Sequence, residues 1–196
     1  MPLTPERAAK ISRVAQCRQQ GILVLEDIHD PHNASACFRT CDAFGFQQVW
    51  LIFKNETPFD PQQIGKSTST ASNKWLDFRI FHSITDCLMQ LKADEYETVA
   101  TAIGGDAESL STARFLHPKT ALLIGNEQRG LSAEALSGAD RRVTISMRGM
   151  CQSLNLSVTA AILLHELTRQ REAEGMERFL LPVEERAQLE QSFLTR

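Results

Sequence analysis

The stretch MRGMCQSLNLSVTAAILLHEL, residues 147–167, joins two halves of unlike character. Its second half is an amphipathic helix, because apolar side chains recur there at helical spacing. Its first half contains Gly149, Ser153 and Asn155, which are poor helix formers, and it follows the strand-like run RRVTIS, residues 141–146. Positions where local propensity is overruled are often functional. We therefore expect a strand, a binding loop and a helix in this order.

Apolar runs alternate with helical segments over the rest of the chain. Because several of these runs are continuous, the strands are expected to be buried on both faces of a parallel sheet. The sequence predicts one α/β domain over residues 1–196, with a mostly parallel sheet, helices on both faces and a peripheral last helix. Strands are predicted at 22–26, 47–53, 78–81, 98–103, 121–125 and 141–146, and helices at about 4–19, 34–45, 83–92, 132–137, 156–167 and 182–193.

Residue types at the helix ends support these boundaries. Thr4 and Ser83 precede predicted helices and are expected to cap them, because a short hydroxyl side chain accepts a hydrogen bond from a free backbone N–H group. Gly21 is expected to end the first helix. Residues 54–74 are polar and predict a long loop, of the kind that is often functional.

Composition and charge exclude several classes of protein. Of the 196 residues, 42% are hydrophobic and 23% are charged, as in an ordinary globular domain. No apolar run reaches the roughly 18 residues of a membrane span, and the N-terminus lacks the apolar core of a signal peptide. We therefore expect a cytoplasmic protein without a membrane partner. The net charge of -3 argues against a DNA-coating protein, whereas a local basic face is enough to bind RNA.

The cysteines predict reduced thiols. Their odd number and scattered spacing do not fit a disulfide framework. Cys37 and Cys41 lie four residues apart, downstream of His29 and His32, so a zinc site is an alternative to packing on an apolar helix face. We favour packing and predict no metal, because the spacing matches known zinc sites poorly. The five cysteines are Cys17, Cys37, Cys41, Cys87 and Cys151.

The first polar cluster is PHNASACFRT, residues 31–40, which follows the strand at 22–26. Ligands of parallel sheets bind beyond the carboxyl ends of the strands, so this cluster is a candidate site. Asn33 can cap the helix or meet a ligand, while Arg39 reaches out from the second turn. The alternative is a capped helix with one solvent-facing arginine.

The second cluster is LLIGNEQRGLS, residues 122–132, where Glu127 lies in a turn between two glycines. A free carboxylate there could bind an amine or a hydroxyl, and the alternative is a plain surface turn. The spacing of the glycines is that of a phosphate loop, but Leu131 and Ser132 stand where Lys and Ser or Thr are required. We therefore exclude a P-loop nucleoside triphosphatase.

The third cluster is the first half of the opening stretch. Gly149 permits an unusual backbone, and the residues Ser153 to Asn155 lead into a helix. Backbone N–H groups at a helix N-terminus favour anionic ligands, and these side chains add donors and acceptors. The alternative is an ordinary helix start that uses Ser153 as its N-cap.

In this order, the three clusters resemble the motifs of the SpoU branch of the SPOUT RNA methyltransferases. The matching segments are HNASACFRTCDAFG, LLIGNEQRGL and MRGMCQSLNLSVTAA, and together they span about residues 23–170. One departure is Leu156, where the family more often has Val. Within the branch, PHNASACFRTCDAFGFQQVW and the tail MERFLLPVEERAQLEQ are most similar to tRNA guanosine 2′-O-methyltransferases.

The resemblance implies a deep trefoil knot at about residues 98–170, S-adenosylmethionine bound in that knot, and a homodimer. It also implies the site residues by motif. The residues implied for catalysis are Asn33, Arg39, Glu127, Ser153 and Asn155. The residues implied for cofactor binding are Gly125, Ile145 and Leu154, with Ile103 and Gly104 added from the loop after TVATAI.

The implied reaction is methyl transfer to a ribose 2′-hydroxyl of RNA, with tRNA as the expected partner. Arg39 is described in the family as the base, but a guanidinium keeps its proton in proteins, so a fixed cation beside the phosphate or oxyanion is the alternative. Trp75 could stack on a base or pack in the core. A basic face for RNA could gather Arg7, Lys10, Arg13, Arg18, Lys66, Lys74, Arg129 and Arg148.

Three other functions stay open on the sequence alone. They are methylation of ribosomal RNA by the same fold, RNA binding without catalysis, and a generic α/β metabolite-binding domain. The intact polar residues of the motifs argue against the second, and the order of three matches argues against the third.

Overall fold

Parallel strands form the centre of the protein. The computed structural model describes residues 4–64 and 72–196, and within these residues seven strands form one sheet in the order β3-β2-β1-β6-β4-β7-β5. Each neighbouring pair runs parallel. The strands are β1 (Gln19–Glu26), β2 (Phe46–Ile52), β3 (Asp77–Phe81), β4 (Glu97–Thr101), β5 (Glu108–Ser109), β6 (Thr120–Ile124) and β7 (Arg141–Thr144).

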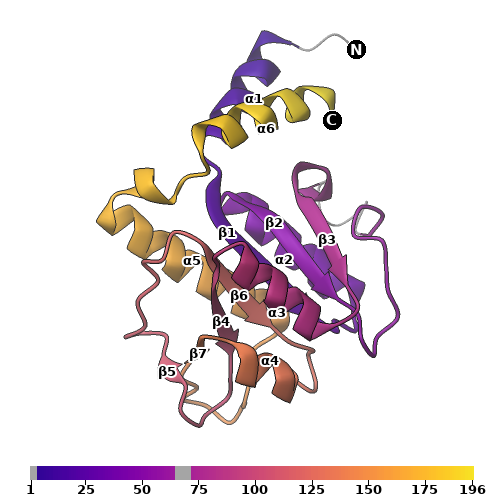
Figure 1. Ribbon diagram of the computed structural model, residues 1–196, viewed down its shortest axis with the longest axis vertical. Coiled ribbons are helices and arrows are strands. Elements are labelled where there is room, and N and C mark those ends of the chain that lie inside the picture. Colours follow the sequence, from indigo (N-terminus) through magenta and orange to yellow (C-terminus); the bar gives the residue numbers. More distant parts are fainter. Residues whose placement is uncertain (1–3, 65–71) are drawn as a thin grey trace.

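Helices cover both faces of this sheet, as predicted (Figure 1). One face packs against α2 (Pro31–Ala43) and α5 (Leu156–Glu174), and the other against α3 (Ile84–Ala93) and α4 (Ala133–Gly138). The remaining helices are α1 (Pro5–Gln16) and α6 (Val183–Thr195), with short 3₁₀ turns η1 (Ser72–Trp75) and η2 (Met176–Phe179). In the described part of the chain, no helix combines the length and apolar character needed to cross a membrane.

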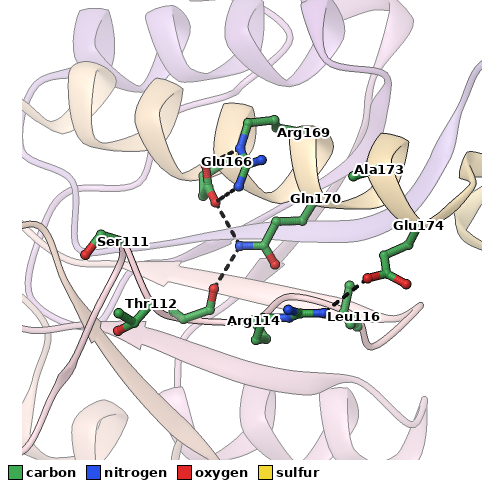
Figure 2. Close-up of a pocket in the computed structure, with 10 residues that line it drawn as sticks. Ser111, Thr112, Arg114, Leu116, Glu166, Arg169, Gln170, Ala173 and Glu174 are labelled. Atoms are coloured by element: carbon green, nitrogen blue, oxygen red, sulfur yellow. Dashed lines mark hydrogen bonds and ion pairs between the residues drawn. The ribbon is translucent and has the colours of Figure 1, made fainter.

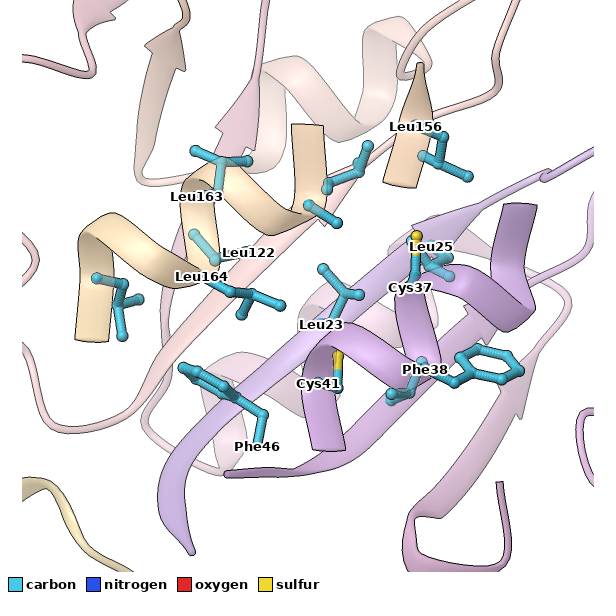
Figure 3. Close-up of a cluster of buried hydrophobic side chains, with 14 of the residues drawn as sticks. Leu23, Leu25, Cys37, Phe38, Cys41, Phe46, Leu122, Leu156, Leu163 and Leu164 are labelled. Atoms are coloured by element: carbon cyan, nitrogen blue, oxygen red, sulfur yellow. The ribbon is translucent and has the colours of Figure 1, made fainter. Parts of the chain in front are cut away.

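The alternation of side chains along β1 builds both cores. Leu23 and Leu25 face α2 and α5, whereas Ile22 and Val24 belong to the cluster on the α3 and α4 side. Figure 3 shows the first cluster, in which helix side chains close over the strand residues. Fully burying one leucine side chain contributes about 1.5–3 kcal/mol, so this layer supplies much of the stability. Its helix residues include Cys37, Phe38, Cys41, Leu156, Leu163 and Leu164.

The N-terminal boundary of β1 differs from the prediction. The first helix ends at Gln16, and Gly21 lies inside β1 instead of ending the helix. Its φ of 145° and the close approach of Phe46, whose Cε1 would lie 2.5 Å from an added Cβ, explain why glycine stands in a strand here. The predicted caps Thr4 and Ser83 are confirmed, because each side chain accepts a backbone N–H of its helix.

The two terminal helices pack against each other at one end of the molecule (Figure 1). Ile11 and Ala15 of α1 bury Phe193 of α6. Trp75 packs edge-on against Phe193, with ring centroids 5.3 Å apart, so the core interpretation of Trp75 is confirmed. The predicted peripheral helix therefore packs at the amino-terminal end of β1.

The sheet brings the last strands into an unusual order. β6 lies between β1 and β4, and β7 pairs with the other side of β4. The loops that follow β4, β6 and β7 therefore begin side by side at the carboxyl edge of the sheet. The knot that the resemblance implies in this region stays a prediction.

Candidate functional site

The predicted site residues follow four adjacent strands. Asn33 and Arg39 come from α2, directly after β1, and Glu127 comes from the turn after β6. Ile103 follows β4, and the loop at 145–155 follows β7. Adjacent strands in a parallel sheet end at the same edge, so these segments begin together at the edge where α/β proteins bind ligands.

A chain of hydrogen bonds joins residues from all three sequence motifs. The Nδ2 atom of Asn33 donates to Oε1 of Glu127 at 3.0 Å. The Nδ2 atom of Asn155 donates to Oδ1 of Asn33 at 3.1 Å. Glu127 also accepts the backbone N–H of His29, at 3.1 Å, through Oε2. Three of the five predicted catalytic residues are thus brought into direct contact.

The helix starts place these side chains, although not in the predicted way. Asp30, not Asn33, caps α2 by accepting the backbone N–H of His32 at 2.9 Å. Asn155, not Ser153, caps α5 by accepting the backbone N–H of Ser157, also at 2.9 Å. Asp30 frees the Asn33 side chain to join Glu127 to Asn155. Neither Asn33, one candidate for the cap of α2, nor Ser153, the cap in the alternative interpretation of α5, takes the cap, because tertiary contacts decide which of several capable residues does so.

The turn after β6 is closed by its own side chains. Asn126 Oδ1 accepts the backbone N–H groups of Gln128 and Arg129, and its backbone exchanges hydrogen bonds with Gly130. Gly125 packs so closely on the far side of the turn that an added Cβ would lie 2.1 Å from the carbonyl carbon of Gly130. The second motif therefore needs glycine at position 125, because the two sides of the turn pack backbone against backbone. This packing holds Glu127 in the middle of the turn.

Arg39 and Ser153 do not join this chain of hydrogen bonds. Both side chains are exposed, and neither forms a hydrogen bond or ion pair with a residue that the structure describes. Arg39 lies six residues beyond Asn33, about 9 Å further along α2. Its guanidinium is exposed, so it is available to a ligand phosphate or oxyanion.

The predicted cofactor residues belong to the loops at this edge. Ile145 and Leu154 are half-buried, and Ile103 is 75% exposed. Gly104 and Gly149 have open space where a side chain would stand. The loop after β4 is tied to β7 by the backbone N–H of Ala102, which donates to the carbonyl of Val143 at 2.9 Å.

A second polar cluster at this edge was not predicted. The Glu56 carboxylate lies 3.0 Å from Nδ1 of His29 and 2.6 Å from Nη2 of Arg129. Hydrogen bonds and charge from Glu56 raise the pKa of His29 above its ordinary value, and those from His29 and Arg129 lower the pKa of Glu56. The sequence pointed to this cluster only through His29, which stands next to the first motif. Glu56 stands in a polar loop that contains no motif.

The cysteines are placed as the packing interpretation predicted. Cys37 and Cys41 are fully buried in the core under α2, and burial raises the pKa of the Cys37 thiol to about 12. Cys17 and Cys151 are exposed. Among residues 4–64 and 72–196, no group of His, Cys, Asp and Glu side chains is arranged to hold a metal ion.

Only some of the predicted basic residues lie at this edge: Arg129 is in the turn after β6 and Arg148 is in the loop after β7. Arg18 is only 1% exposed and pairs with Asp42 at 2.6 Å, so its predicted role in an RNA-binding face was wrong. Arg7, Lys10 and Arg13 lie on α1, at the opposite end of β1 from the site. An eight-residue strand spans about 26 Å, which separates them from the site within one subunit. Lys66 lies outside the described residues.

A separate cavity lies along the second half of α5. Its volume is about 300 Å³, and it is lined by the loop at 111–116 and by α5 (Figure 2). Its charges are paired internally: Arg169 binds Glu166, and Arg114 binds Glu174. Gln170 is also satisfied, by Ala113 and Glu166. None of the predicted site residues lines this cavity, so it does not compete with the carboxyl edge as the candidate active site.

Comparison with known proteins gives the same family for most of the chain. The model of the SpoU rRNA Methylase family matches residues 20–165. The tRNA (guanosine(18)-2'-O)-methyltransferase of Escherichia coli strain K12 is 35% identical over 191 residues, which cover 95% of this chain and 81% of that protein. The crystal structure of the A. aeolicus TrmH/SpoU tRNA modifying enzyme has a TM-score of 0.86 at 30% identity and covers 97% of this chain and 95% of that one.

A solved structure with a bound cofactor is also similar. The SpoU methyltransferase AviRb from Streptomyces viridochromogenes, in complex with the cofactor AdoMet, has a TM-score of 0.70 at 27% identity. The alignment covers 80% of this chain and 60% of that chain.

Proposed function

The chain belongs to the SpoU rRNA methylase family, and on that premise we propose that it transfers a methyl group from S-adenosylmethionine to a ribose 2′-hydroxyl of tRNA. The observation that carries this proposal is the hydrogen-bonded chain Glu127–Asn33–Asn155, which unites the three motifs at one edge of the sheet. The relative with 35% identity carries tRNA in its name, which favours tRNA over ribosomal RNA as the substrate.

The residues at this edge fit S-adenosylmethionine. Ile103 and Met150 are apolar yet exposed, at 75% and 102%, so an adenine ring or a thioether chain could cover them. Gly104 and Gly149 leave their backbone open, so a ligand can approach it closely. We assign cofactor binding to Gly125, Ile145, Leu154, Ile103 and Gly104. When bound, S-adenosylmethionine supplies an already activated methyl group.

The chain's own residues must then prepare the ribose hydroxyl. A hydroxyl is a weak acid, so the site has to stabilise the oxyanion that develops as the methyl group is transferred. We assign this role to Arg39 as a fixed cation, because a guanidinium keeps its proton. The proton then leaves to a phosphate oxygen or to water.

The other polar residues orient the reactants. Glu127 holds the loop after β1 through the backbone N–H of His29 and holds Asn33 through its amide. Asn33 and Asn155 thereby present their remaining donors and acceptors toward the ribose. Ser153 is exposed just before α5, where its hydroxyl can bind an RNA phosphate.

The proposed assembly is a cytoplasmic homodimer. Light scattering of the purified protein tests this directly, and a mass of about twice the 21.9 kDa of the chain is expected.

The test of the function is methyl transfer from labelled S-adenosylmethionine to total tRNA and to ribosomal RNA, with the product nucleoside identified by mass spectrometry. We expect label in a 2′-O-methylguanosine of tRNA. Label in ribosomal RNA alone would keep the chemistry and overturn the substrate. No transfer to either RNA, together with failure to bind S-adenosylmethionine, would favour the non-catalytic alternative.

A further inference from the structure

We propose that Glu56 is a positioning residue of this site, because its carboxylate joins His29 of the loop after β1 to Arg129 of the turn after β6. This inference rests on the proposed function, since the two segments that Glu56 joins carry Asn33 and Glu127. Glu56 itself comes from the loop after β2, outside the three motifs.

The backbone around Glu56 is fixed by a buried carboxylate. Asp27, at the end of β1, accepts the backbone N–H groups of Lys54 at 2.7 Å, Asn55 at 2.9 Å and Glu56 at 3.3 Å, and the side-chain amide of Asn55 at 2.6 Å. Burial raises the pKa of Asp27, but these hydrogen bonds outweigh burial and hold it below its usual value. The carboxylate of Asp27 therefore fixes the backbone of residues 54–56 to the end of β1.

The conformation of Asp27 supports this role. Its φ is +50°, in the left-handed region that residues other than glycine seldom adopt. Such conformations are strained and cluster at functional sites. The carbonyl of Asp27 also accepts Nδ2 of Asn126 at 2.7 Å, which ties the same residue to the turn after β6.

Glu56 then makes two charged contacts from this fixed backbone. Its side chain is 18% exposed, whereas those of His29 and Arg129 are 68% and 56% exposed. An ordinary surface ion pair contributes little because both side chains are mobile. Here the carboxylate is largely covered and its backbone is held, so it can fix the two mobile cations.

The carboxylates of Glu127 and Glu56 both connect the loop after β1 to the turn after β6. Glu127 reaches from the turn after β6 to the backbone N–H of His29, and Glu56 reaches the side chain of His29 and the side chain of Arg129. Arg129 lies two residues from Glu127. Without Glu56, Arg129 is a free cation that can pair with Glu127 and draw it away from Asn33.

Three carboxylates act on the pKa of His29. Glu56 raises its pKa most, with smaller contributions from Glu127 and Asp30. Replacing Glu56 by a neutral isostere should therefore lower the pKa of His29 toward its ordinary value. This titration reports the contact separately from catalysis.

The test uses the full-length protein with Glu56→Gln, Arg129→Gln and the double variant. We expect each single variant to lower kcat about tenfold, within the ~100-fold that a 1 Å misplacement can cost, with the same cofactor affinity by calorimetry. The double variant should be no slower than the slower single variant, because both substitutions remove the ion pair between Glu56 and Arg129. The pKa of His29, measured by NMR, should fall in Glu56→Gln.

Glu134→Gln is the matched control. Its carboxylate pairs with Lys54 at 3.0 Å, next to the same loop, but forms no ion pair with His29 or Arg129. We expect its kcat to equal that of the wild type. If the wild type is active and Glu56→Gln has the same kcat, this inference is overturned while the proposed function stands. Additive losses of kcat in the double variant would also overturn this inference alone. A wild type that transfers no methyl group would overturn the proposed function and this inference with it.

Discussion

Asn33 and Glu127 are 94 residues apart in the sequence, yet Nδ2 of Asn33 donates to Oε1 of Glu127 at 3.0 Å. The contact joins the first turn of α2 to the turn after β6, so it requires that β1 and β6 be neighbours in the sheet. The order of the strands and the composition of the site are therefore linked.

This contact should appear as an energetic coupling. Asn33→Ala, Glu127→Ala and the double variant form a double-mutant cycle on the free energy of unfolding in urea. Hydrogen bonds to charged groups are worth about 1.5–3 kcal/mol, so we expect a coupling of about 1–2 kcal/mol for this partly exposed pair. Strictly additive losses would show that the two side chains do not interact in solution.

Gly125→Ala should destabilise the protein by about 3 kcal/mol or more, because its Cβ would lie within 2.1–2.3 Å of backbone atoms of Gly130 and Leu131. Backbone cannot move aside as a flexible side chain does, so the turn that carries Glu127 must open. Gly149→Ala is the control, since an added Cβ there meets nothing within 4 Å. Equal midpoints of thermal unfolding for the two variants would contradict the close packing of this turn.

Arg171 is a buried cation without a carboxylate partner among the described residues. Its guanidinium donates to Oε1 of Gln19 and to the backbone carbonyls of Gln20, His117 and Pro118, and burial lowers its pKa to about 9, so it stays charged at pH 7.

Replacing this arginine should therefore leave several carbonyl groups unsatisfied. We expect Arg171→Met to lower the free energy of unfolding by about 2–4 kcal/mol, even though methionine is cheaper to bury. Arg169→Met, which removes only an exposed pair with Glu166, should cost less than about 1 kcal/mol. Urea unfolding measures both, and a stable Arg171→Met would mean that water replaces the guanidinium.

The thiols should fall into two classes of reactivity. Cys37, Cys41 and Cys87 are buried, and burial raises the pKa of Cys37 and Cys87 to about 12, so almost no reactive thiolate exists at pH 8. Cys17 and Cys151 are exposed. A thiol reagent should modify these two in the native protein and all five in denaturant. Rapid native labelling of Cys37 or Cys41 would contradict the packing of α2.

Much of the fold could be predicted because its signals are local. Continuous apolar runs marked β1, β2, β4 and β6, and the periodic segment after residue 155 marked α5. The motif residues were also found from sequence, because Asn33, Glu127 and Asn155 follow strands that end at one edge. Whether they act in catalysis stays a prediction.

The rest depended on contacts between distant segments. Arg18 belongs to a basic-looking N-terminal segment, but Asp42 and the carbonyls around it bury the guanidinium. The sequence offered Asn33 and Ser153 as possible caps, whereas Asp30 and Asn155 take these positions. Glu56 stands in a loop without periodicity or motif, and only the folded backbone at Asp27 brings it to His29.

The most direct test of the central claim is the rate of methyl transfer to tRNA by Arg39→Ala, with Arg169→Ala as a matched control. Arg39 is exposed at the site edge, whereas Arg169 lies about 20 Å along α5 from its start. The account predicts that Arg39→Ala loses at least about 100-fold in kcat while binding S-adenosylmethionine normally, and that Arg169→Ala is unchanged. An Arg39→Ala protein that methylates tRNA at the wild-type rate would contradict it.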